Sequence, residues 1–160
     1  MLRVFDASSA IYAWDNYPIA QFPLVWKWLH IEIQAQHLHI SEVALDEVRN
    51  ISTECAEWLD HAQVNVLPVT NEILISANRF KKLLNIFGDV YGAGVGENDL
   101  LIIATASQNG FELISDENSQ PTLPKVKANY KIPAVCAIPQ VAVSCHSFLN
   151  YLKRSAQVFI

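Results

Sequence analysis

Residues 98–116, NDLLIIATASQNGFELISD, pass from a helix into a strand and decide the fold. The first part is apolar almost all round, which predicts a helix against or within the core, and Gly110 is typical of its end. Asn98 is expected to cap this helix, so that Asp99 lies in its first turn. FELIS then predicts a buried strand with Asp116 at its end. A helix that leads into a buried strand is the unit from which parallel sheets are built.

The stretches on either side continue this alternation. The expected strands are LRVF at residues 2–5, VNVLPV at 64–69 and VAVSC at 141–145, and the expected helices cover 23–35, 41–51, 54–62, 71–88 and a segment from Ser147. Between the helix at 71–88 and Asp99, four of the five glycines lie in GDVYGAGVGEN, which predicts a mobile loop. The pattern predicts one domain over residues 1–160, a three-layer α/β/α sandwich with a largely parallel central sheet.

Composition excludes several classes of protein. Hydrophobic residues make up 51% of the 160 residues and charged residues 17%, which is unlike a disordered chain. No apolar run approaches the roughly 20 residues of a membrane helix, and the opening LRVFDASS does not resemble a secretion signal. We therefore expect a cytoplasmic protein with no membrane partner. The three cysteines form no CxxC pair and the five histidines no HExxH motif, so a disulfide framework or a histidine-based metal site is not expected.

Charge is distributed unevenly along the chain. The net charge is −5, but residues 1–117 carry all 16 acidic and six basic residues, whereas residues 118–160 carry five basic residues and no acidic one. An acidic protein does not bind nucleic acid by net charge alone, so such binding would require a local basic strip. The candidates are Lys125, Lys127 and Lys131, with Tyr130 between them to stack a base; the alternative is a solvated lysine-rich loop.

Four acidic residues stand beside strongly apolar segments: Asp6, Glu47, Asp99 and Asp116. Each has an ordinary structural explanation: a helix cap for Asp6, a solvated helix face for Glu47, a favourable first-turn anion for Asp99 and a turn for Asp116. Two of them follow predicted strands, however, and ligands of parallel sheets bind outside the carboxyl ends of strands. Their combination is therefore more informative than any one of them.

The ordered set FDxSS, LDEVR, NDLLIIATA and LISDE resembles the PIN-domain nucleases, including the VapC-type toxins, over residues 4–146. The segment IYAWDNYP at residues 11–18 is similar to a separate PIN-like branch rather than to the small toxins. The resemblance implies a metal-dependent endoribonuclease, a hydrolase that leaves a 5′-phosphate and a 3′-hydroxyl, and the toxin of a toxin–antitoxin pair. It also implies an RNA substrate and an antitoxin partner.

The chemistry of such a site agrees with the residues. Mg²⁺ and Mn²⁺ prefer oxygen ligands, and an acidified water attacks the phosphodiester without a Ser, Cys or His nucleophile. Four converging acids should also raise the pKa of at least one of them when no metal is bound. We expect Asp6, Asp99 and Asp116 to hold the principal ion, with Glu47 binding through water or orienting the attacking water, and Ser8 donating to a carboxylate from behind. Nearby alternatives to these ligands are Asp15, Glu42, Glu97 and Glu117.

Other functions and partners stay open at this point. A PIN fold without turnover would act as a binding or scaffold module. A metal-dependent phosphatase is the third possibility, but the opening DASS lacks the second aspartate of a DxDxT motif and no Gly-rich phosphate loop follows the first strand. Trp28 and Ile31, which lie off the main apolar stripe of their helix, are candidates for a homodimer or antitoxin surface.

Overall fold

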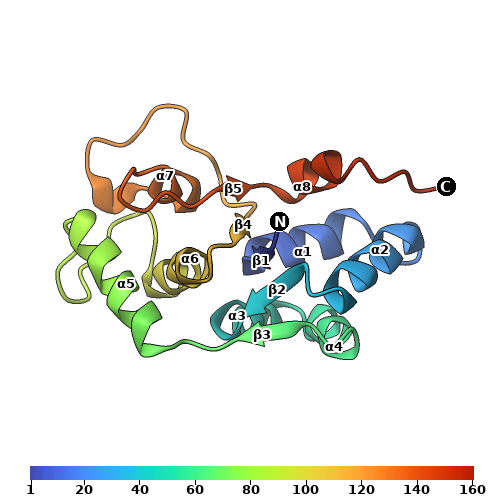
Figure 1. The fold of residues 1–160 in the computed structure, drawn as a ribbon. Coiled ribbons are helices and arrows are strands. Elements are labelled where there is room, and N and C mark those ends of the chain that lie inside the picture. The colour runs from blue at the N-terminus through green and yellow to red at the C-terminus, as the bar shows by residue number, and fades with distance from the viewer.

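In the computed structural model, which describes residues 1–160, one five-stranded sheet runs through the molecule (Figure 1). All its pairs are parallel, in the order β3-β2-β1-β4-β5. The strands are β1 (Arg3–Phe5), β2 (Leu38–Ser41), β3 (Asn65–Leu67), β4 (Glu112–Ile114) and β5 (Cys145–His146). The helices are α1 (Ala7–Asn16), α2 (Pro23–Gln34), α3 (Glu42–Ile51), α4 (Thr53–His61), α5 (Asn71–Leu83), α6 (Glu97–Asn109), α7 (Ile132–Cys136) and α8 (Phe148–Ser155), with a 3₁₀ turn at Lys127–Asn129.

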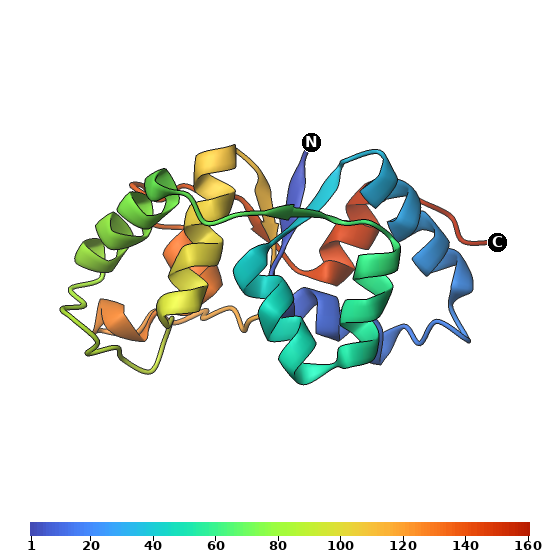
Figure 2. The ribbon, with the colours of Figure 1, turned by 90° about the horizontal axis from the view of Figure 1, so that it is seen from below.

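Helices cover both faces of the sheet, which confirms the predicted three-layer sandwich. Figures 1 and 2 show α5, α6 and α7 together to one side of the strands, and α1, α2, α4 and α8 to the other. Helix α3 packs against both α1 and α6 and so connects the two groups. None of the helices combines the length and the apolar character that crossing a membrane would require.

The strand register brings three chain segments to one edge of the sheet. Phe5 is paired with Ile40 on one side and with Ile114 on the other. The residues that follow these three positions therefore leave the sheet side by side, at the carboxyl ends of β1, β2 and β4. The central strands are buried, as near-continuous apolar strands of parallel sheets must be.

An ion cluster joins the C-terminal helix to the sheet. Glu112 of β4 is only 3% exposed, and its carboxylate accepts hydrogen bonds from Arg3 Nε at 3.2 Å and from Arg154 Nη1 at 3.1 Å. His146 Nε2 lies 3.7 Å from the same carboxylate. A buried carboxylate requires such partners, because an unpaired buried charge is strongly unfavourable. Helix α8 is thereby tied to β1 and β4.

Several boundaries differ from those that the sequence predicts. Helix α5 ends at Leu83 rather than near Gly88, because the chain turns at Asn85, whose φ of 56° is left-handed. Helix α6 begins at Glu97 with Gly96 as its N-cap, so Asn98 is not the cap. Strand β2 and helix α1 were not predicted as elements, and neither was α7.

Trp28 contributes less to the surface than predicted, although it lines the same groove as Ile31. Its side chain is 8% exposed, since α8 and the C-terminal segment cover it: its ring lies 4.9 Å from that of Tyr151 and 5.8 Å from that of Phe159, centroid to centroid. Ile31, one turn further along α2, is 54% exposed. Ile31 is therefore the more exposed of the two residues, while both line the groove between α2 and the C-terminal segment.

Candidate active site

Asp6 occupies the carboxyl end of β1, in the middle of the sheet. Its side chain is 3% exposed, and Oδ2 accepts hydrogen bonds from the hydroxyl of Ser8 and from Ser115 Oγ at 2.9 Å. Asp6 is the N-cap residue of α1 by position, but its side chain makes no capping bond, so helix capping does not account for the carboxylate. Burial raises the pKa of Asp6, the two serine hydroxyls oppose this rise, and the charge of Asp99 adds to it.

Glu47 reaches the same region from α3. It is half-buried rather than on a solvated helix face, and its Oε1 is buried without any hydrogen-bond partner. Burial, followed by the charges of Asp6 and Asp99, raises the pKa of Glu47 from 4.5 to about 7, although a hydrogen bond with the Asn98 side chain opposes the rise. The charge of Glu117 acts in the same direction as those of the two aspartates.

Asp99 lies in the first turn of α6, where its Oδ2 accepts a hydrogen bond from the backbone N–H of Gly96 at 2.9 Å. Burial raises its pKa, this backbone bond lowers it, and the charge of Glu117 raises it. A small pocket of about 90 Å³ opens beside Asp99, and it is also lined by loop residues 93–95, Glu117, Lys131 and Ile132. A cation and two carboxylates therefore share the lining of one small pocket.

Asp116 and Glu117 follow β4 and face different surroundings. Oδ2 of Asp116 accepts hydrogen bonds from Ser9 Oγ at 2.6 Å and from the backbone N–H of Phe148 at 3.1 Å, and the charge of Asp116 raises the pKa of Tyr17. Its carboxylate thus connects the ends of β4, α1 and α8. Glu117 instead acts on the pKa of both Glu47 and Asp99. The acids that influence one another are consequently Asp6, Glu47, Asp99 and Glu117, while Asp116 as a metal ligand stays a prediction.

Other residues named from the sequence divide into those near the acids and those away from them. Ser8 donates to Asp6 and accepts from the backbone N–H of Asp116 at 2.9 Å. Lys131 lines the pocket beside Asp99, whereas Lys125 and Lys127 are exposed and line none of the described pockets. Ser115, which also supports Asp6, was not named from the sequence; its signal is a hydroxyl residue placed directly after a buried strand.

The remaining acidic alternatives lie elsewhere. Asp15 is exposed at the end of α1, and Glu42 Oε1 accepts a hydrogen bond from the backbone N–H of Val69 at 2.7 Å. Glu97 lines a separate pocket on the other side of the α6 N-terminus. Only Glu117, of the four alternatives, joins the acidic group.

The acidic group has the donor chemistry of a hard cation site, although it is not in coordinating geometry. No three His, Cys, Asp or Glu side chains of the chain are close enough to hold one ion together. The donors are nonetheless all carboxylate oxygens, three of the acids have raised pKa values, and one buried oxygen of Glu47 has no partner. A divalent cation would satisfy that oxygen and relieve the repulsion, so the residues fit such an ion once the carboxylates move closer together.

The comparisons with known proteins extend over nearly the whole chain. A family model described as a domain of unknown function, DUF4411, matches residues 4–159. No curated protein matches the sequence. Among solved structures, a chain in the complex of VapBC2 from Rickettsia felis with a DNA fragment from their promoter is 15% identical, with a TM-score of 0.59 over 92% of this chain and 98% of that one.

Two further structures are similar to the same extent. A chain of DNA-bound VapBC from Salmonella typhimurium is 16% identical, with a TM-score of 0.56 over 92% of this chain and 99% of that one. PAE2754 from Pyrobaculum aerophilum is 13% identical, with a TM-score of 0.55 over 98% of this chain and 91% of that one. At these identities the likeness concerns the fold.

Proposed function

We propose a nuclease function for this chain, which belongs to the family described as a domain of unknown function (DUF4411) and has the PIN-domain fold. It is a divalent-metal-dependent endoribonuclease that hydrolyses RNA phosphodiester bonds, leaving a 5′-phosphate and a 3′-hydroxyl, and it is the toxin of a toxin–antitoxin pair. The observation that carries the proposal is the group of four carboxylates at the carboxyl edge of the sheet, in which burial and the neighbouring charges raise the pKa of Asp6, Glu47 and Asp99.

Asp6, Glu47, Asp99 and Glu117 would hold Mg²⁺ or Mn²⁺, with Asp116 as the alternative to Glu117. When bound, such a cation acidifies water and stabilises the charge that develops on the phosphate and on the departing oxygen. Asp6 is fixed for this task by the Ser8 and Ser115 hydroxyls, and Asp99 by the Gly96 backbone. These bonds hold the two carboxylates in place before any ligand arrives.

Glu47 supplies the proton chemistry of the proposed reaction. Without a bound cation the pKa of its carboxyl is about 7, and a cation beside it would favour the ionised form that can accept a proton. Its partnerless Oε1 would bind the cation through a water or orient the attacking water. Asn98 orients the carboxyl through its side-chain hydrogen bond.

Lys131 is the proposed phosphate-binding cation of this site. It shares the small pocket with Asp99 and Glu117, so a phosphate held beside the acids would lie within reach of a positive charge. Lys125 and Lys127 would contact the RNA further along, where they would add affinity without taking part in the cleavage step.

The direct test is cleavage of a mixed pool of single-stranded and transfer RNA in Mn²⁺ or Mg²⁺. We expect the native chain to cut and EDTA to abolish cutting, and we expect Asp99→Asn to be inactive while folded, because its amide oxygen can still accept from Gly96. Asp46→Asn is the matched control, since Asp46 is an exposed acid on α3. Cleavage by Asp99→Asn at the native rate would refute the assignment. No cleavage by any variant, without stabilisation of the native chain by Mn²⁺, would favour a binding or scaffold module.

An antitoxin is the proposed protein partner. The likeness to chains of two VapBC structures supports this, and so does a surface groove of about 320 Å³ that Leu24 and Ile31 of α2 line together with Val158 and Ile160. If the gene next to this one encodes a small DNA-binding protein, that protein should neutralise the cleavage. Ile31→Asp should then weaken neutralisation without lowering cleavage; a mass measurement in solution tests the alternative occupant, a second copy of the chain.

A further inference from the structure

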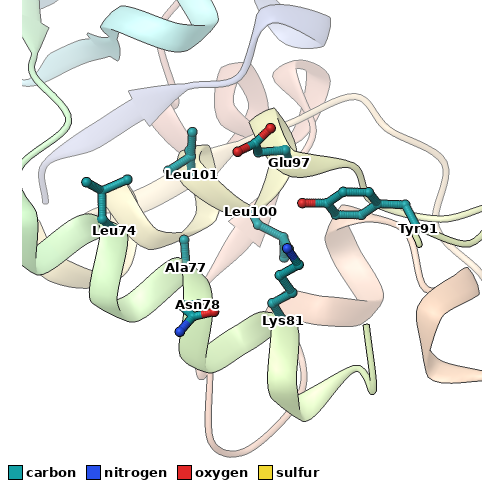
Figure 3. A pocket seen from close by; sticks show the side chains of 8 residues that line it. All are labelled: Leu74, Ala77, Asn78, Lys81, Tyr91, Glu97, Leu100 and Leu101. Carbon is teal, nitrogen blue, oxygen red and sulfur yellow. The ribbon is translucent and has the colours of Figure 1, made fainter. Parts of the chain in front are cut away.

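A second pocket lies on the other side of the glycine-rich loop from the acidic group. It has a volume of about 140 Å³ and is formed between α5, α6 and Tyr91 (Figure 3). Two connections join it to the acidic site. The first connection is the first turn of α6, where Glu97 lines this pocket and Asp99, two residues later, belongs to the acidic group. The second is the loop before α6, where Tyr91 lines this pocket and Gly94 lines the pocket beside Asp99. A single-stranded RNA that crosses the loop could therefore occupy both pockets.

The pocket has an apolar floor and a polar rim. Leu74 and Leu100 provide apolar surface, and the rim carries Asn78, Lys81, Tyr91 and Glu97. Figure 3 shows the Tyr91 hydroxyl and the Lys81 ammonium directed towards the space between the lining residues. Flat apolar surface with a few polar groups around it is the usual composition of a small-ligand site.

Lys81 is the group that most clearly lacks a partner. It is half-buried, and no carboxylate oxygen lies within 4.0 Å of its ammonium. Its Nζ lies 5.1 Å from the centre of the Tyr91 ring, so a weak cation–π contact is its only described partner. Asn78, Tyr91 and Glu97 likewise make no side-chain hydrogen bond within the chain; Asn78 and Glu97 are exposed, so a ligand would replace water at their polar atoms.

The size and chemistry of the pocket select one class of ligand. Pockets for drug-sized molecules measure about 300–1,000 Å³, so a volume of about 140 Å³ suits one planar ring system. Bases that leave the stack of a nucleic acid pack their faces against aromatic or apolar side chains, and Leu74 and Leu100 provide such a surface here. Guanine presents acceptors at O6 and N7, which suit Lys81, and an amino donor at N2, which suits the Glu97 carboxylate. Adenine keeps the N7 acceptor but carries an amino donor in place of O6, and it has no amino group at N2 for Glu97.

We propose that this pocket binds a guanine base of the RNA substrate, next to the scissile phosphate, and thereby determines where the chain cuts. The inference rests on the proposed nuclease function for its biological meaning, but the binding of guanine itself does not require catalysis. Lys81, Glu97 and the Tyr91 hydroxyl recognise the base edge, and the apolar floor formed by Leu74 and Leu100 contacts its face.

The test is a titration of the native chain with GMP, AMP, CMP and UMP in EDTA, followed by amide chemical shifts. We expect GMP to shift amides of α5 and α6 around the pocket and to bind about tenfold more tightly than the other three nucleotides, the gain of one good pair of base contacts. Lys81→Gln and Glu97→Gln should remove this preference. Lys82→Gln and Glu72→Gln, which change exposed charges of the same kinds on α5, should keep it.

A second measurement separates this inference from the nuclease proposal. The cleavage products of a mixed RNA pool should show a guanine at a fixed distance from the cut, and this preference should fall about tenfold in Lys81→Gln. If all four nucleotides shift the amide resonances equally, or if no nucleotide shifts them, the guanine pocket is overturned even if the chain cleaves RNA. Selective binding of GMP by a chain that cleaves no RNA would instead refute the nuclease and leave the pocket standing.

Discussion

Asp116 and Glu117 are neighbours in the chain, but their carboxylates face different surroundings. Asp116 holds Ser9 and the first N–H of α8, whereas Glu117 adds its charge to Glu47 and Asp99. The sequence could not separate the two, because successive side chains at the end of a strand point in opposite directions and one residue of register exchanges them. For Asp6, Glu47 and Asp99, by contrast, the sequence pattern does predict the surroundings that the structure shows, because each of these acids stands beside an apolar segment.

Substituting Glu117 should lower cleavage, whereas substituting Asp116 should lower stability. We expect Glu117→Gln to lower metal-dependent cleavage by at least about 100-fold, while the free energy of unfolding changes little, because the exchange removes a charge from the cation site. Asp116→Ala should lower the free energy of unfolding by about 1–3 kcal/mol, because it leaves the Ser9 hydroxyl and the Phe148 N–H without their acceptor.

Urea unfolding and RNA cleavage, measured on both variants, check these expectations. Asp116→Asn, whose amide oxygen can still accept, is the control for stability and should remain active. Full activity of Glu117→Gln together with an inactive but folded Asp116→Asn would return Asp116 to the set of ligands.

At the scale of the elements, the glycine-rich loop forms the wall between the two pockets, and it is fixed from across the chain. The backbone N–H of Val95 donates to the Tyr130 carbonyl at 2.8 Å, and that of Ala93 to Asn129 Oδ1 at 2.8 Å. At Gly94 the two backbones approach so closely that a Cβ would overlap Asn129 and Tyr130. Glycine is required there for space rather than for its backbone angles.

Gly94→Ala should therefore displace the loop. We expect a loss of about 2 kcal/mol in the free energy of unfolding, the usual cost of overpacking, and a marked loss of cleavage because the pocket wall moves away from Asp99. Gly96→Ala is the matched control, since a Cβ there meets nothing within 4 Å; it should cost less than about 1 kcal/mol. Equal effects of the two exchanges on thermal unfolding and cleavage would contradict the steric explanation.

The elements that the sequence predicts well are those with a long, clear pattern. Helix α6 and strand β4 follow from an apolar helix that ends at Gly110 and a short apolar run after it. Strand β2 was not predicted, although it is central, because its four residues LHIS are too short to show a period and include a histidine. His39 is buried there and stacks on Phe111 with ring centroids 4.8 Å apart, a contact that only the tertiary structure creates.

For the molecule as a whole, the acidic group lowers the stability of the folded chain at neutral pH and forms the proposed cation site. Asp6, Glu47 and Asp99 all have pKa values above their ordinary ones, so the folded chain binds more protons than the unfolded chain at mildly acidic pH. The sequence predicted a raised pKa from mutual repulsion, but burial is the largest cause for each of the three. Which carboxylate is buried depends on the packing of the helices, and so was not readable from the residues.

Without divalent cations, stability should therefore fall as pH rises. For Glu47 the loss occurs between its ordinary pKa of 4.5 and its raised pKa of about 7, and the curve flattens above that. Glu47→Gln should remove part of this slope and stabilise the chain at pH 7.5 by on the order of 1 kcal/mol, a moderate value because solvent reaches the half-buried carboxyl. Thermal unfolding in EDTA at several pH values measures this, and a slope as steep as that of the native chain would contradict the assignment to Glu47.

Adding Mn²⁺ at neutral pH should reverse the loss. A cation that binds only the folded chain raises its free energy of unfolding by about 2.7 kcal/mol at 100 times its dissociation constant. Asp6→Asn should abolish both this gain and the metal-dependent cleavage while leaving the fold in place, and Asp46→Asn should retain both. An Asp6→Asn chain that still cleaves RNA would rule out the site.

The all-parallel sheet has a consequence for synthesis on the ribosome. Strand β1 is made first, yet its partner β4 lies at residues 112–114, and no hairpin can pair neighbouring strands earlier. The same holds for the acidic group, because Ser115, which donates to Asp6, is synthesised long after it. Glu117 and Lys131, which neighbour Asp99, also follow it in the chain. A nascent chain thus lacks a complete acidic site until most of its length has left the exit tunnel, so translation itself would delay the proposed nuclease activity.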